Sequence, residues 1–150
     1  MNDANRDLLL IRPMRQTDTA VVARLATTLG YPSEAEVVHA RWREIGGSDL
    51  LLVAVDQKDE PVGFIQAHPV CIIEAGFRVE ILGLVVSSRA RRRGVGRRLI
   101  VEVERWAENI GAEAVVVRSN TQRTEAHDFY PAMSYEKIKT QAVYQKQLNR

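Results

Sequence analysis

The chain has 150 residues, with 21 Lys and Arg against 19 Asp and Glu, a formal net charge of +2 and one cysteine. This length suits a single domain over residues 1–150, and 45% hydrophobic residues exclude a disordered chain. No apolar run approaches the roughly 18 residues of a membrane span, and the polar N-terminus is unlike a signal peptide. Cys71 is the only cysteine, which excludes an internal disulfide. We therefore expect a cytoplasmic protein that does not enter a membrane.

The first half of the chain predicts a strand, two helices and a hairpin. Asp18 is an N-cap candidate for the first helix, and Gly30 marks its end. Ser33, with Glu36 three residues later, has the pattern of a capping box for the second helix. Two apolar stretches on either side of the polar turn at 56–60 are typical of a β-hairpin. The expected ranges are Leu8–Arg12, Thr19–Leu29, 33–45, Asp49–Val55 and Pro61–Ala67.

The second half predicts an apolar strand, a long helix and further short elements. Gly83, inside the most apolar strand, indicates a bulge or a close backbone approach. The apolar residues of the long helix recur every three or four positions, which places them on one face. Pro131 is expected to end the following short helix before it. The expected ranges are Arg78–Val86, Gly94–Ile110, Glu113–Arg118, Glu125–Tyr130, Tyr135–Lys139 and Ala142–Lys146.

The order of these elements predicts a mixed α/β sheet. A strand, helix and strand in succession form a right-handed crossover, so Arg78–Val86 and Glu113–Arg118 should be parallel neighbours. The hairpins require antiparallel pairing elsewhere. We therefore expect about seven strands, mostly antiparallel, with helices on both faces.

Six arginines fall within residues 87–98 (SSRARRRGVGRR), where no acidic residue occurs. The rest of the chain has 15 basic residues against 19 acidic ones. This basic loop follows a strand and precedes a helix, whose first backbone amides have no partner within the helix. Gly94 and Gly96 let a ligand approach the backbone, so the pattern favours a phosphate or pyrophosphate. A solvated charge run and a nucleic-acid patch are the alternatives.

Two common phosphate motifs do not fit this loop. A dinucleotide-binding fingerprint needs a third glycine where Leu99 stands, and a Walker loop needs Gly-Lys-Ser/Thr. Arg91 to Gly96 (RRRGVG) instead resembles the Arg/Gln-x-x-Gly-x-Gly/Ala motif of the GNAT N-acetyltransferase superfamily. Leu10-Ile11-Arg12-Pro13 with Asp18 resembles the N-terminal signature of that family, and Asn120 with Ala126–Tyr130 resembles its last motif. The order of elements is similar along nearly the whole chain.

The resemblance implies acetyl-coenzyme A as co-substrate and a sheet that splays between its fourth and fifth strands. In that family, backbone amides of the loop bind the pyrophosphate, and the pantetheine arm pairs with the strand before it. The residues to which this role transfers are Leu84, Val85, Val86, Arg91, Arg92, Arg93, Gly94, Val95, Gly96 and Arg97, with Asn120 and Tyr130 also contacting the coenzyme.

Two residues are candidates for the acid–base chemistry of acetyl transfer. Glu80 lies in the most apolar strand, where burial would raise its pKa and suit a general base, and histone-type members of the family have a catalytic glutamate at this offset. Its alternatives are a solvent-facing side chain or a pair with Arg78, and a base acting through water would serve equally well. Tyr130 resembles the family's tyrosine near the coenzyme sulfur, and its phenol can protonate a thiolate.

The acceptor is left open by the sequence. A primary amine of a small molecule is the expected substrate, and a protein lysine or N-terminus is the alternative. Tyr31 and Trp42 are candidate wall residues, although each is more typical of packing. The three histidines lack ligand spacing, so no metal site is expected. The family implies a homodimer, and it often has glycine where this chain has Ser134. A nucleic-acid module and a member without catalysis are the remaining alternatives.

Overall fold

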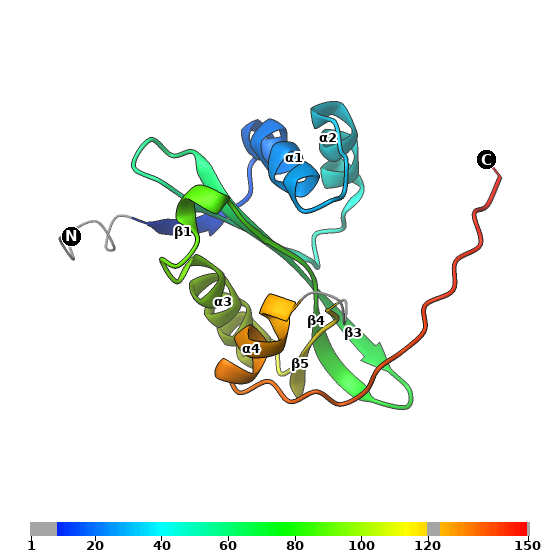
Figure 1. Ribbon diagram of the computed structural model, residues 1–150. Coiled ribbons are helices and arrows are strands. Elements are labelled where there is room, and N and C mark those ends of the chain that lie inside the picture. The colour runs from blue at the N-terminus through cyan, green and yellow to red at the C-terminus, as the bar shows by residue number, and fades with distance from the viewer. Residues whose placement is uncertain (1–8, 120–123, 150) are drawn as a thin grey trace. The chain divides into compact units, whose positions relative to one another are not determined.

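The computed structural model of the protein describes residues 9–119 and 124–149. The chain divides into two compact units, Met1–Arg118 and Ser119–Arg150. The first unit contains a five-stranded sheet in the order β1-β2-β3-β4-β5, antiparallel except for the parallel pair β4 and β5 (Figure 1). Its elements are β1 (Leu10–Pro13), α1 (Thr19–Thr28), α2 (Ala35–Glu44), β2 (Leu50–Val55), β3 (Pro61–Ile72), β4 (Gly76–Val86), α3 (Val95–Asn109) and β5 (Ala114–Val117).

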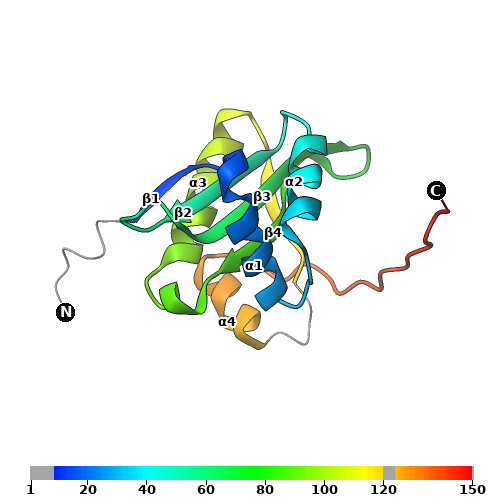
Figure 2. The same cartoon turned by 90° about the horizontal axis from the view of Figure 1, so that it is seen from above.

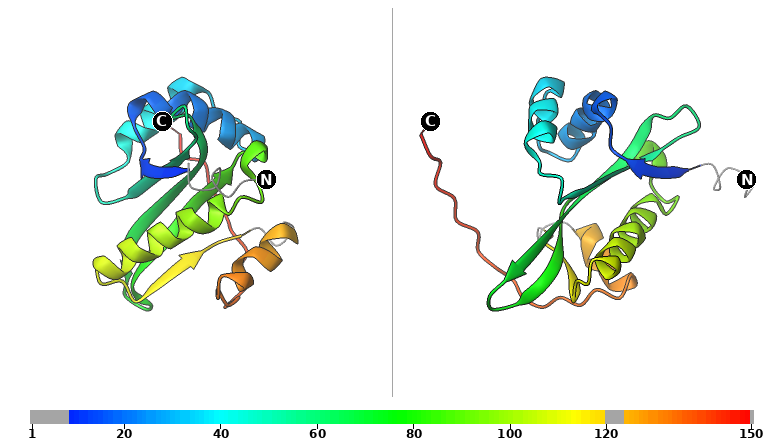
Figure 3. Two further views of the ribbon diagram at one scale, coloured as in Figure 1. Left: turned by 90° about the vertical axis from the view of Figure 1, so that its left-hand side faces the viewer. Right: turned by 180° about the vertical axis from the view of Figure 1, so that it is seen from behind.

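Helices cover both faces of this sheet, as expected. Figures 2 and 3 show α1 and α2 on one face and α3 on the other. Successive side chains of a strand point to opposite faces of the sheet, so the apolar residues of one strand can pack against helices on both faces. Val22 of α1 packs with Val53 and Val55 on one face. On the other face lie the fully buried α3 residues Leu99 and Val103.

A glycine in β3 lets α3 approach the sheet closely. A Cβ at Gly63 would lie 3.1 Å from Cγ1 of Val95 and 3.1 Å from the carbonyl oxygen of Val85. Val95 is the first residue of α3, and Val85 lies near the end of β4. The missing side chain at Gly63 therefore sets the beginning of α3 directly against the end of β4.

The bulge that Gly83 indicated is confirmed. Gly83 pairs with Gln66 and Ile81 pairs with Ala67, so Leu82 is an extra residue in β4. On its other side, β4 pairs with β5 only from Arg78 to Ile81. Beyond Ile81, none of the strands in the described residues pairs with β4 on that side. Among the described residues, the end of β4 therefore has no strand partner on that side, and we call this stretch the free edge of β4.

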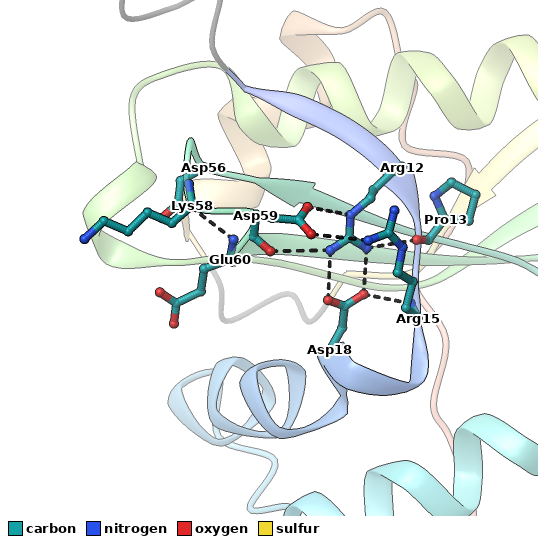
Figure 4. Close-up of polar contacts among 8 residues, drawn as sticks. All are labelled: Arg12, Pro13, Arg15, Asp18, Asp56, Lys58, Asp59 and Glu60. Atoms are coloured by element: carbon teal, nitrogen blue, oxygen red, sulfur yellow. Dashed lines mark hydrogen bonds and ion pairs between the residues drawn. The ribbon is translucent and has the colours of Figure 1, made fainter.

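An ion-pair network joins β1 to the turn between β2 and β3 (Figure 4). Nη1 and Nη2 of Arg12 donate to the two carboxylate oxygens of Asp18 at 2.8 and 3.0 Å, and its Nε donates to Asp59 at 2.9 Å. The backbone amide of Arg15 donates to Asp18 at 2.7 Å. Arg12 and Asp18 expose only 8% and 4% of their side chains, whereas Asp59 exposes 56%. Burial opposes ionisation of Asp18, but the hydrogen bonds from Arg12 and the Arg15 amide hold its pKa below the usual range.

Among the described residues of the second unit, the helical segment is α4 (Thr124–Ala132). The expectation that the helix ends before Pro131 is wrong, because Pro131 lies inside it. Pro131 is the second-to-last residue of α4, so the missing hydrogen bond and the ring clash that a proline brings affect only the last turn. The two last strands, near 135–139 and 142–146, are also wrong, since residues 133–149 contain no strand and the sheet has five strands rather than about seven. The side chains of Val143 and Tyr144 are 86% and 93% exposed, so no neighbouring strand covers them.

Ser134 closes α4 in a conformation that favours glycine. The amide of Tyr135 donates to the carbonyl of Tyr130 at 3.1 Å, and the amide of Ser134 donates to that of Pro131 at 3.0 Å. These two bonds form a Schellman motif with Ser134 at the left-handed position, where its φ is 69°. The Tyr130 and Tyr135 rings, 6.0 Å apart, add the usual hydrophobic contact.

We expect Ser134→Gly to stabilise the protein by about 1 kcal/mol, because glycine has no Cβ penalty at positive φ. Equilibrium unfolding in urea measures this change. Ser134→Ala keeps the Cβ and is the matched control, for which no gain is expected. Equal unfolding free energies for the glycine and alanine variants would contradict the prediction.

Candidate active site

The basic loop between β4 and α3 is fixed at both ends by buried residues. Ala90 and Val95 are each only 2% exposed, whereas the arginines between them lie at the surface. Arg92 and Gly94 have positive φ values of 67° and 74°. The chain therefore turns sharply between two anchored points, and the turn leads directly into α3.

The first turn of α3 presents free backbone donors beside this loop. The amide of Arg98 donates to the carbonyl of Gly94 at 3.0 Å, which is the first bond of the helix. The amides of Val95, Gly96 and Arg97 precede that bond and have no carbonyl within the helix. Their N–H groups, the helix dipole and the six nearby arginines all favour an anion.

Gly96 has no conformational reason to be glycine. It lies inside α3 and is not among the glycines of positive φ. Glycine inside a helix costs about 0.5–1 kcal/mol relative to alanine. The sequence motif predicts instead that Gly96 allows a ligand to approach the backbone closely.

The free edge of β4 continues directly into the basic loop. Leu84 and Val86 are half-buried and Val85 is buried, and the Ser87 amide donates to the carbonyl of Val62 at 2.7 Å. The structure thus places the expected coenzyme residues Leu84–Val86 and Arg91–Arg97 on one continuous stretch of the first unit. Of the two other expected contacts, Asn120 lies outside the described residues and Tyr130 belongs to the second unit.

Glu80 is clamped by two arginines rather than surrounded by apolar groups. Its carboxylate accepts hydrogen bonds from Arg118 at 2.7 and 3.3 Å and from Arg78 at 2.8 Å. The hydrogen bond from Arg118 is the largest cause of a lowered pKa, burial opposes it, and the hydrogen bond from Arg78 adds to it. The expectation of a raised pKa at Glu80 is therefore wrong. The base role itself stays a prediction, and these ion pairs count against it.

His68 and Asp49 lie next to Glu80, and neither was predicted to be a site residue. His68 is the cross-strand partner of Glu80 in the β3–β4 ladder. Its Nδ1 lies 2.5 Å from Oδ1 of Asp49, and Nε2 of Gln66 donates to Oδ2 of Asp49 at 3.2 Å. The sequence predicted that this strand ends at Ala67, which would leave His68 in a loop. Because Leu50 pairs with Ala67, one more strand residue places His68 opposite Asp49.

The other candidate residues lie apart from this cluster in the sequence. Tyr130 belongs to the second unit, where its ring contacts Phe129 edge-on at 5.1 Å. Tyr31, between α1 and α2, is 62% exposed. Trp42 of α2 is half-buried and stacks on His39 at 6.1 Å. These contacts are compatible with packing and do not by themselves define an acceptor site.

The described residues contain neither a metal-ion cluster nor a membrane-spanning helix. No group of three or more His, Cys, Asp or Glu is placed to hold a metal ion within 9–119 and 124–149. Among the same residues, no helix has both the length and the apolar character of a membrane span.

The family of the chain follows from its sequence. The profile of the acetyltransferase (GNAT) family matches residues 19–135, and the chain belongs to this family. It is therefore an acetyl-coenzyme A-dependent N-acetyltransferase, as the basic loop and its flanking elements indicated. No curated protein sequence matches the chain.

Solved structures share the fold. The aminoglycoside 6'-N-acetyltransferase AAC(6')-Ih from Acinetobacter baumannii is 17% identical with a TM-score of 0.79, covering 94% of this chain and 99% of that one. AAC(6')-Iy with a bisubstrate analogue is 22% identical with a TM-score of 0.80, covering 93% and 99%. Glucosamine-6-phosphate N-acetyltransferase from Arabidopsis thaliana is 16% identical with a TM-score of 0.78, covering 93% and 99%.

Proposed function

We propose that this protein transfers the acetyl group of acetyl-coenzyme A to a primary amine of a small molecule, by direct attack in a ternary complex. The observation that carries the proposal is the free edge of β4, which leads into the amides at the beginning of α3. Structures with the same fold include enzymes named for aminoglycoside and glucosamine-6-phosphate substrates. Both of these substrates are small and carry amines, which supports the same class for this chain.

The free edge and the free amides suit two different parts of the coenzyme. Pantetheine contains amide groups, so it can pair with the backbone of Leu84–Val86 as an added strand does. The pyrophosphate carries negative charge, which suits the amides of Arg91–Arg97 and the dipole of α3. Asn120 is proposed as a further contact to the coenzyme arm. Because β5 pairs with β4 only as far as Ile81, the arm is proposed to lie along β4 beyond that residue.

Acetyl transfer requires a neutral amine, donors for the oxyanion and a proton for the departing thiolate. The bulge at Leu82 turns backbone groups out of the ladder with β3, and an N–H there is the proposed oxyanion donor. Tyr130 is the proposed acid for the thiolate. Direct attack needs no acyl-enzyme, so Cys71 has no role in this scheme.

Release of free thiol from acetyl-coenzyme A tests the function. The assay compares aminoglycosides, amino sugars and a lysine-containing peptide as acceptors, each against a reaction without an acceptor. We expect turnover with a small amine to exceed turnover with the peptide. Turnover with the peptide alone would replace the small-molecule acceptor by a protein, and absence of turnover with every amine would contradict the proposal.

Replacing Tyr130 by phenylalanine is expected to lower kcat by about 100-fold or more while leaving the affinity for acetyl-coenzyme A nearly unchanged. The ring stays, so its contacts with Phe129 and Tyr135 are retained, and only the proton donor is lost. Steady-state kinetics on the best acceptor measure the effect. Tyr144→Phe, on the exposed segment after α4, is the control. Full activity of Tyr130→Phe would show that another group protonates the thiolate.

A further inference from the structure

His68 and Asp49 form a hydrogen-bonded pair that has no role in the steps proposed above. We propose that His68, oriented by Asp49, is the group that takes the proton from the acceptor amine. The inference rests on the proposed function and assigns a base to it. Asp49 would be a positioning residue, because it acts only through the imidazole.

The carboxylate of Asp49 is held at both oxygens. Oδ1 lies 2.5 Å from Nδ1 of His68, and Oδ2 accepts from Gln66 at 3.2 Å. The Asp49 side chain is only 9% exposed, whereas that of His68 is 44% exposed. A hydrogen bond from Nδ1–H to the carboxylate places the single proton of the neutral ring on Nδ1. Nε2 is then the free acceptor on the exposed ring.

The neighbouring carboxylate is poorly suited to this role. Both oxygens of Glu80 already accept hydrogen bonds from guanidinium groups, which lowers its pKa. A general base needs an acceptor atom that is available to the substrate, and Nε2 of the half-exposed His68 ring is better placed for this than the Glu80 oxygens. Glu80 instead serves to fix Arg78 and Arg118 in place.

The position of His68 places it near the expected reaction centre. It pairs with Glu80, two residues before the bulge at Leu82, where β4 loses its second neighbour. At about 3.3 Å per strand residue and about 4.8 Å between strands, His68 and Leu82 are about 8 Å apart along the sheet. An amine with one water molecule spans that distance. His68 lies on the same face of the ladder as Glu80, the face covered elsewhere by α1 and α2.

The charges around His68 come from three elements. Asp49 precedes β2, Glu80 and Arg78 belong to β4, and Arg118 follows β5. Two carboxylates face two guanidiniums in this group. A proton arriving on Nε2 therefore creates an imidazolium beside the Asp49 carboxylate, while the charge of Glu80 is already matched by the arginines.

The step balances in protons and bonds. Nε2 of His68 takes one proton from the bound ammonium, and the freed nitrogen attacks the acetyl carbonyl carbon. The carbon–sulfur bond then breaks as the tetrahedral species collapses. The second nitrogen proton ends on the coenzyme sulfur, with Tyr130 as the proposed relay, and the imidazolium returns its proton to solvent.

His68→Gln tests the assignment, using the best acceptor from the thiol-release assay. We expect kcat to fall by about 100-fold or more, with the KM for acetyl-coenzyme A unchanged within about twofold. The fall of kcat/KM toward acidic pH should disappear in this variant, because the titrating base is gone. Imidazole added to His68→Ala should restore part of the activity. Cys71→Ser, three residues along the same strand, is the control and should retain wild-type rates.

Asp49→Asn provides a second arm that leaves the histidine in place. The asparagine amide can donate to Nδ1 and so move the ring proton to Nε2, which removes the acceptor. We expect a loss of kcat of about 10-fold or more and a change of tautomer in the ¹⁵N NMR signals of the ring. Wild-type kcat in His68→Gln, or an unchanged acidic limb, would overturn the inference and leave the proposed function intact. Absence of turnover by the wild-type protein with every amine would overturn both.

Discussion

Replacing Asp18 by alanine is expected to lower the free energy of unfolding by about 3–5 kcal/mol. The substitution leaves the guanidinium of Arg12 buried, with two of its hydrogen bonds lost. It also removes the acceptor of the Arg15 amide. Arg12 keeps its bond to the exposed Asp59, but the loss of its buried partner costs far more than the net contribution of the intact pair. Urea unfolding of the purified protein measures this change.

Asp59→Asn is the matched control for this prediction. Asp59 also pairs with Arg12, but its side chain is 56% exposed, so the expected cost is about 0–1 kcal/mol. Asparagine tolerates the positive φ of 62° at this position about as well as aspartate does. Equal losses in the Asp18 and Asp59 variants would contradict the central position of the Arg12–Asp18 pair.

The contribution of Asp18 should also depend on pH. Its pKa in the folded protein is lowered, so its contribution is fully present above the unfolded value of about 3.9. That contribution is lost as the pH falls through the lower folded value. The difference in stability between the wild type and Asp18→Ala should therefore be constant near neutral pH and shrink in acid. A difference that grew in acid would contradict the assignment.

Gly96→Val is expected to weaken the binding of acetyl-coenzyme A by about 10- to 100-fold. The branched side chain would stand over the free amides of α3 and displace the pyrophosphate. Loss of one charge-assisted hydrogen bond of about 1.5–3 kcal/mol corresponds to that range. The fold should be unaffected, because valine favours a helix more than glycine does. Calorimetric titration measures the affinity, and circular dichroism checks the fold.

Arg89→Ala is the control that distinguishes binding by the backbone amides from attraction by the positive charge of the loop. Arg89 belongs to the same basic loop but precedes the buried Ala90, outside the proposed cradle of residues 91–97. Its loss should weaken binding by less than about threefold at physiological salt. An effect of Arg89→Ala equal to that of Gly96→Val would indicate attraction by charge alone.

The sequence predicted the parts of the molecule that depend on local patterns. The apolar spacing from Val95 to Val103 located α3, and Gly83 indicated the bulge in β4. The parallel pairing of β4 with β5 followed from the handedness of crossovers. The proposed residues of the coenzyme site rest on the loop motif, which is also local, and they stay a prediction. These features involve short stretches whose structure is set by neighbours in the chain.

The surroundings of Glu80 and His68 depend on contacts between residues far apart in the sequence, which local patterns do not reveal. Arg118 reaches Glu80 across 38 positions of sequence, which reversed the expected direction of the Glu80 pKa. His68 joined the site only because β3 runs on to Ile72, past the expected end at Ala67. The two strands expected near 135–139 and 142–146 are absent, because a short stretch forms a strand only where another strand supplies hydrogen bonds and cover.

The central claim is that the loop from Arg91 to Arg97 binds the pyrophosphate of acetyl-coenzyme A through its backbone. Calorimetric titration of acetyl-coenzyme A into the wild-type protein tests it most directly. The same titration is made with dephospho-coenzyme A, which keeps the pyrophosphate, and with pantetheine, which lacks it. We predict saturable binding of one coenzyme per chain, retained by fragments that keep the pyrophosphate and lost by pantetheine alone. No detectable coenzyme binding, together with DNA binding that falls steeply with salt, would contradict the account.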